Sequence, residues 1–163
     1  MRAGEGTGAE TDSRTVSTLR SGFLAIAGVT TVALALELAA ERHWTQPIQL
    51  VAWAALAITL VAIGLVLGRP TPIRLRLAQI LAILVVVSAV WGIWEHIESN
   101  YDAGELDQVY TAQWESLPET TRWWLAVSKT VGPSPPLAAG ALAQAGACVL
   151  FATLRHPGHR STI

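Results

Sequence analysis

The sequence predicts an all-α membrane protein: a polytopic, four-helix transmembrane bundle with a short interfacial helix in its outer loop. Of the 163 residues, 52% are hydrophobic and only 14% are charged, whereas a soluble domain carries roughly 25% charged residues. The charges are also unevenly spread, so that four long apolar runs remain. Each run is close to the ~20 residues that a helix needs to cross the hydrocarbon core of a bilayer.

The first predicted span covers residues 21–40 and follows a polar tail, residues 1–20. A cleaved signal peptide is the alternative interpretation of this run. Its apolar stretch, however, exceeds the ~7–15 residues of a signal peptide, and no clear small-residue cleavage site follows it. We therefore expect the run to remain in the protein as a membrane span, with Glu37 as its one charged residue.

Three further spans are predicted at residues 48–68, 77–94 and 137–154. They are apolar on all sides, which excludes the alternating pattern of a membrane β-strand. Because a backbone in lipid must satisfy its own hydrogen bonds, helix is the remaining conformation. Pro47 at the start of the second span and Pro72 before the third agree with these boundaries.

Small residues within the spans offer surfaces on which helices can approach closely. They are Gly64 and Gly68 in the second span, and Ala138, Ala139, Gly140, Ala141, Ala145, Gly146 and Ala147 in the fourth. Packing inside the bundle is the favoured interpretation, and contact with a membrane protein partner or a second copy is the alternative. Gln79 and Gln144 are expected to hydrogen bond to neighbouring helices.

The basic residues predict the orientation of the bundle. Four crossings place the N-terminal tail, the second turn and the C-terminal tail on one side, with Arg2, Arg14, Arg20, Arg69, Arg74, Arg76, Arg155 and Arg160. The other side holds only Arg42, Arg122 and Lys129, together with most of the acidic residues. Because positive residues favour the cytoplasmic side, we expect a multi-pass protein of the cytoplasmic (inner) membrane with both termini inside. The near absence of lysine indicates a GC-rich, bacterial source.

Two segments outside the spans, the C-terminal tail and the loop between the third and fourth spans, differ in character. The tail at 155–163 is basic and includes His156 and His159, and we expect it to be attracted to anionic lipid rather than to bind metal. Residues 95–136 form the outer loop. The third helix is expected to extend into this loop and to end near Asp102, Ala103 and Gly104.

A short helix is predicted later in the outer loop. Ser116 is the expected N-cap and Glu119 its capping-box partner. Trp123, Trp124 and Val127 would then lie towards one side of the helix. Such a helix either lies on the membrane surface or packs over the mouth of the bundle, and the sequence does not separate the two.

Several classes of function are excluded by composition. Cys148 is the single cysteine, so the chain holds neither an intrachain disulfide nor a CxxC redox centre. The formal net charge of −1 gives no reason to expect nucleic acid as a partner. No nucleophile–base pattern, phosphate-binding loop or dinucleotide fingerprint is visible.

Acidic residues gather at the outer ends of the first and third spans. Glu37 and Glu41 share one face of the first helix, and Glu95 and Glu98 share one face of the third. Intramembrane carboxylates are disfavoured by lipid and usually face the interior of a bundle. Carboxylates facing each other from two helices could bind a divalent cation, with His43 and His96 nearby.

This acidic cluster has four interpretations. The favoured one is structural: the acids lie in the headgroup layer, paired with Arg42 or Arg122, and the histidines hold no ligand. Metal binding by Glu37, Glu41, Glu95, Glu98, His43 and His96 comes next, although a regular helix turns each histidine away from the acidic face. A proton-linked role for Glu37 follows. Haem between His43 and His96 is disfavoured because both lie at the membrane edge.

The cluster leaves three classes of function. A non-enzymatic binding or accessory component of a membrane complex is the function that we favour from the sequence. A cation- or metal-binding or transport protein that uses the outer carboxylates is the alternative. A membrane enzyme or electron carrier with a metal or haem rests only on the presence of His and Glu.

Overall fold

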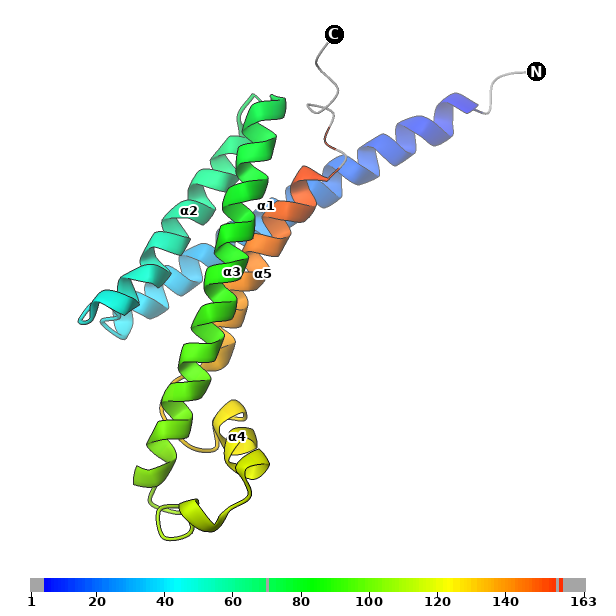
Figure 1. Ribbon diagram of the computed structural model, residues 1–163. Helices are drawn as coiled ribbons and strands as arrows, with labels where there is room; N and C mark the ends of the chain where they lie inside the picture. Colours follow the sequence, from blue (N-terminus) through cyan, green and yellow to red (C-terminus); the bar gives the residue numbers. More distant parts are fainter. Residues whose placement is uncertain (1–4, 70, 155, 157–163) are drawn as a thin grey trace.

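The protein is an all-α bundle with four helices that are long and apolar enough to span a membrane, as the sequence predicts. The computed structural model describes residues 5–69, 71–154 and 156. The α-helices are α1 (Glu5–Ala40), α2 (Leu50–Leu67), α3 (Pro72–Ala103), α4 (Glu119–Val127) and α5 (Pro136–Thr153) (Figure 1). Three short 3₁₀ helices lie in the connections: η1 (Pro47–Gln49), η2 (Gly104–Leu106) and η3 (Trp114–Ser116).

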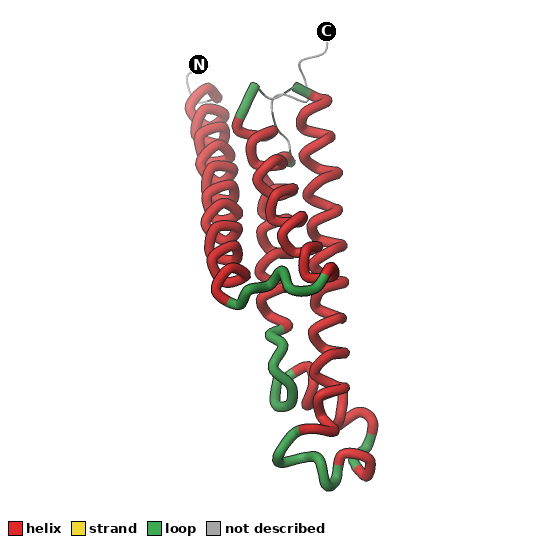
Figure 2. Tube along the Cα trace, turned by 90° about the vertical axis from the view of Figure 1, so that its left-hand side faces the viewer, coloured by secondary structure: helices red, strands yellow, loops and turns green. Residues whose placement is uncertain are grey.

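The two ends of the bundle differ. The start of α1, the α2–α3 turn and the end of α5 lie at one end, here called the terminal end (Figure 1). The α1–α2 turn lies at the opposite end, the loop end. Past this turn, α3 continues outward and carries residues 104–135 with it, as Figure 2 shows. Of the predicted tail residues, Arg2, Arg155, His159 and Arg160 lie outside the described part of the chain.

Two helices are longer than their apolar runs. α1 begins at Glu5, so most of the predicted polar tail is helical, and α3 begins at Pro72 rather than at residue 77. At the start of α3 the Thr71 hydroxyl accepts a hydrogen bond from the Arg74 backbone N–H at 3.3 Å, which caps the helix. Hydropathy identifies only the apolar part of a helix. The polar residues that precede the apolar runs of α1 and α3 are helical as well. The predicted extension of α3 into the loop is confirmed, with Ala103 as its last residue.

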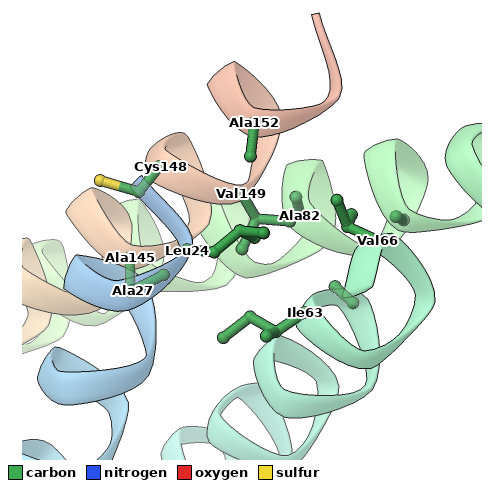
Figure 3. Packing of buried hydrophobic residues seen from close by; sticks show 11 residues of the cluster. Leu24, Ala27, Ile63, Val66, Ala82, Ala145, Cys148, Val149 and Ala152 are labelled. Carbon is green, nitrogen blue, oxygen red and sulfur yellow. The ribbon is translucent and has the colours of Figure 1, made fainter. Parts of the chain in front are cut away.

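Small residues bring the spanning helices together. α3 packs against α2 and α5, and α5 packs against α1. The largest buried cluster takes alanines from all four helices, among them Ala27, Ala62, Ala82 and Ala145 (Figure 3). A Cβ on Gly146 would lie 3.1 Å from the Ala82 carbonyl oxygen, so this glycine permits the close α3–α5 contact. Internal packing, predicted for Ala145 and Gly146, is thereby confirmed.

Of the other predictions about the spans, one is confirmed and the others are not. The Gln79 side chain donates to the Thr153 hydroxyl at 3.1 Å, which confirms its predicted bond between helices. Gln144 is exposed, and no hydrogen bond joins its side chain to the described residues. A Cβ on Gly64 or Gly140 would meet nothing within 4 Å. Internal packing was therefore the wrong prediction for these two glycines, whose faces are open.

The outer lobe, residues 97–135, has a small core of its own. Trp114, Leu125, Ala126 and Val131 are buried together. Asn100 of α3 is fully buried and donates through Nδ2 to the Ala126 carbonyl at 3.2 Å. The lobe is therefore a folded unit built on the extension of α3.

The predicted start of α4 was wrong. The N-cap position is Pro118, without a side-chain cap, and the Ser116 hydroxyl instead donates to the Gln113 carbonyl at 2.7 Å within η3. α4 packs against the extension of α3 rather than over the bundle mouth, as Figure 1 shows. Trp123 stacks on Tyr101 at a centroid distance of 4.4 Å, whereas Trp124 is 68% exposed.

Candidate functional site: a cleft at the loop end

The turn after α1 determines where His43 lies. The helix ends at Ala40, and Arg42 adopts a left-handed backbone conformation with φ of 52°. The His43 N–H then donates to the Leu38 carbonyl at 2.8 Å, and the Arg42 N–H to the Ala39 carbonyl at 3.2 Å. This pair of bonds is a Schellman motif, which satisfies the last carbonyls of the helix and reverses the chain.

A second contact holds the turn against α2. The Trp53 indole N–H donates to the His43 carbonyl at 2.8 Å, and the rings of Trp44 and Trp53 lie 6.1 Å apart. Because the backbone of His43 is bonded on both sides, the imidazole is directed by the turn and not by the helical repeat of α1. The expectation that a regular helix turns this histidine away from the acidic face therefore does not apply.

On α3, the neighbouring residues Glu95 and His96 are both half-buried. They lie where α3 passes the α1–α2 turn. Glu98, one turn further on, is exposed and does not line the loop-end cleft. The two glutamates on this face of α3 thus have different surroundings.

A cleft opens between the four spanning helices at this level. Its narrower part encloses about 50 Å³ and its wider part about 260 Å³. The two parts share His43, Ala52, His96, Ala139 and Leu142, so they adjoin each other. Each part is smaller than the roughly 300–1,000 Å³ of a drug-sized ligand site.

The cleft has an apolar floor and a polar rim. Leu34, Leu38, Leu56, Ala138 and Leu142 supply apolar surface in the narrower part. The polar rim consists of Glu37, Glu41, His43, Gln49, Ser88, Glu95, His96, Ser99 and Ser134. An apolar chain and a polar head would thus find different surroundings in the same space.

The charged side chains of the rim are carboxylates, so the rim is negative. Glu41, Glu95 and His43 are close enough to the His96 imidazole to interact with it electrostatically. None of the residues that line the cleft is lysine or arginine. The carboxylates of Glu37, Glu41 and Glu95 therefore give the rim a negative potential, which favours a cation.

The structure brings together five of the six residues predicted as metal ligands. Glu37, Glu41, His43, Glu95 and His96 line the cleft, and Glu98 does not. Within the described part of the chain, however, no group of three or more His, Cys, Asp or Glu side chains is arranged to hold a metal ion. The metal hypothesis gains no support from this geometry and stays a prediction.

Other lining residues were not predicted. Ser88, Ser99, Ser134 and Gln49 add hydrogen-bonding groups to the rim. Ser99 and Ser134 face each other from α3 and the segment before α5, with their hydroxyl oxygens 3.3 Å apart. Serine is common in membrane helices, so no sequence signal distinguished these positions; only the register of α3 against α5 brings them to the cleft.

Comparison with known proteins identifies no relative. No protein-family model, no curated protein and no solved structure matches the chain. The function has to be argued from the cleft itself.

Proposed function

We propose that this is a non-enzymatic binding protein of the membrane, and that its loop-end cleft takes an amphiphilic cation. The ligand class is a protonated amine or quaternary ammonium head on an apolar chain. One observation carries the proposal: three carboxylates and two imidazoles, with no lining lysine or arginine, line the two adjoining parts of a cleft whose floor is apolar.

The carboxylates favour the cationic head. Glu37 and Glu41, one turn apart in α1, line the narrower part, and Glu95 of α3 lines the wider part that adjoins it. A positive head where the two parts adjoin is attracted by several carboxylates at once. Because neutral histidine accepts as well as donates hydrogen bonds, His43 and His96 add contacts for an N–H group.

The apolar floor favours a chain rather than a bare ion. Leu34, Leu56 and Leu142 come from α1, α2 and α5, and each CH₂ group buried against them contributes about 0.8 kcal/mol. A hydrated metal ion would leave this surface in contact with water. The floor therefore supports an amphiphile over the alternative of metal or simple cation binding.

A binding role also agrees with the hydroxyl groups of the rim. The Ser88 hydroxyl donates to the Val85 carbonyl at 2.9 Å, and the Ser134 hydroxyl to that of Ser99. These bonds use the hydroxyl protons of Ser88 and Ser134 in contacts other than to the imidazoles. A nucleophile activated by histidine would need the opposite arrangement.

We also propose that the loop end faces the exterior of a bacterial inner membrane. Among the described residues, Arg14, Arg20, Arg69, Arg74 and Arg76 belong to the terminal end. Arg42, Arg122 and Lys129 are the basic residues of the loop end. The excess of arginine at the terminal end favours the cytoplasm for that side, which opens the cleft to ligands that arrive from outside.

The test is equilibrium binding to purified protein in nanodiscs, with empty nanodiscs as the blank. The probes are radiolabelled dodecylammonium, dodecanol and dodecanoate, which share a chain and differ in the charge of the head. We expect saturable binding of dodecylammonium alone. Glu95→Gln should weaken that binding about fivefold, the effect of losing ~1 kcal/mol of charge interaction.

Glu98→Gln is the matched control, because it removes the same charge from the same helix one turn outside the cleft. It should leave binding unchanged within twofold. Equal binding of all three probes, or equal effects of Glu95→Gln and Glu98→Gln, would contradict the proposal. Stoichiometric divalent metal that is lost from Glu95→Gln would favour the metal alternative.

A further inference from the structure

The exposed face of α5 carries a polar side chain at the middle of the span. Gln144 lies halfway along Pro136–Thr153 and is exposed. No hydrogen bond joins its amide to the residues that the structure describes. In a bilayer, this position would leave a primary amide in hydrocarbon, where an unsatisfied polar group is strongly disfavoured.

The residues around Gln144 repeat with the spacing of a helix–helix seam. Leu137, Gln144 and Phe151 are seven residues apart and all exposed, and Gly140, Ala147 and Leu154 fall between and after them at the alternating 3–4 spacing. This is the a/d pattern of two helices that pack side by side. Because a Cβ on Gly140 would meet nothing within 4 Å, the bundle itself does not require this glycine.

From the unpaired amide and this spacing, we infer that α5 is the contact surface for a second copy of the protein, with the two Gln144 side chains hydrogen bonded to each other. Two copies inserted in the same orientation are related by an axis along the membrane normal. Their α5 helices are then parallel, and Gln144 meets Gln144 at the same depth. A primary amide carries both a donor and an acceptor, so each side chain satisfies its counterpart.

A second copy fits this surface better than a different partner does. An unrelated helix would need its own polar group at the same depth, whereas the twofold relation supplies one automatically. Gly140, one turn from Gln144, lets the two backbones approach closely enough for the amides to meet. The inference is independent of the cleft, which lies on the inward faces of the helices at the loop end.

Dimerisation is measured by energy transfer between donor- and acceptor-labelled copies in liposomes, as the protein is diluted with lipid. The wild type should show a concentration-dependent dimer. Gln144→Leu should weaken dimerisation about 3- to 30-fold, the range expected for a hydrogen bond between membrane helices.

Two glycine variants separate loss of the interface from loss of folding. Gly140→Leu and Gly64→Leu both place a side chain in open space on a spanning helix, so both proteins should fold. Only Gly140→Leu should abolish the energy transfer. Energy transfer unchanged by Gly140→Leu, equal loss in both variants, a monomeric wild type, or a different protein held stoichiometrically through Gln144 would each overturn the inference.

Discussion

The amide of Asn100 holds the backbone of Ser134 from both sides. Nδ2 donates to the Ser134 carbonyl at 2.8 Å, and Oδ1 accepts from the Ser134 N–H at 2.9 Å. The same Nδ2 donates to Ala126 at the end of α4. One side chain of α3 thus anchors both the outer lobe and the segment that leads into α5. The anchored residue of that segment, Ser134, also lines the cleft.

Replacing Asn100 should therefore loosen the lobe while the spanning bundle remains. Asn100→Leu leaves the backbone N–H and C=O of half-buried Ser134 without their Asn100 partners, at about 1–3 kcal/mol for each, and removes one of the hydrogen bonds that the Ala126 carbonyl accepts. We expect residues 104–135 to become sensitive to protease in mild detergent, with intact fragments on either side. Ser99→Ala, at the exposed neighbouring position, should leave the lobe resistant; equal cleavage of both variants would contradict this role.

The turn at Arg42 gives a second prediction. A non-glycine residue at positive φ is unfavourable by roughly 1 kcal/mol, and Arg42 has φ of 52°. Arg42→Gly should preserve or raise thermal stability in detergent, whereas Arg42→Val should lower it by about 1–2 kcal/mol. Because the turn also directs His43 to the cleft, Arg42→Val should weaken dodecylammonium binding as well. Binding that is unaffected by Arg42→Val would show that the turn does not organise the site.

The two span glutamines should respond differently to the same change. Gln79→Leu removes the bond to Thr153 and should destabilise the isolated bundle by about 0.6–2 kcal/mol. Gln144→Leu removes no bond within the described chain and should leave the stability of the monomer unchanged or higher. Reversible unfolding in mixed micelles, at a dilution where the protein is monomeric, measures both. A larger loss from Gln144→Leu would mean that its amide is used inside the bundle.

The spans could be predicted from the sequence because hydropathy reports directly on the solvent around a helix. The four apolar runs coincide with the four spanning helices, and the extension of α3 to Ala103 was also foreseen. The predicted cap at Ser116 was wrong, because the same hydroxyl can serve a 3₁₀ turn or a helix start. Only the folded chain shows that Pro118 is the N-cap position and that α4 begins at Glu119.

The cleft was predictable in its chemistry but not in its shape. Charged and imidazole groups near the ends of the first and third spans are visible in the sequence, and five of the six selected residues line the cleft. The separation of Glu95 from Glu98 was not visible, since both lie on one face of α3. Nor was the apolar floor, because Leu34, Leu56 and Leu142 resemble every other apolar residue until the helices are packed.

The most direct measurement uses the histidines as reporters. In protein with ¹⁵N-labelled histidine side chains, His43 and His96 lie at the cleft and His156 follows α5 at the terminal end. On titration with dodecylammonium in nanodiscs, the His43 and His96 ring resonances should shift saturably while those of His156 stay unchanged. Shifts of all histidines alike, or none at His43 and His96, would contradict a cation-binding cleft at the loop end.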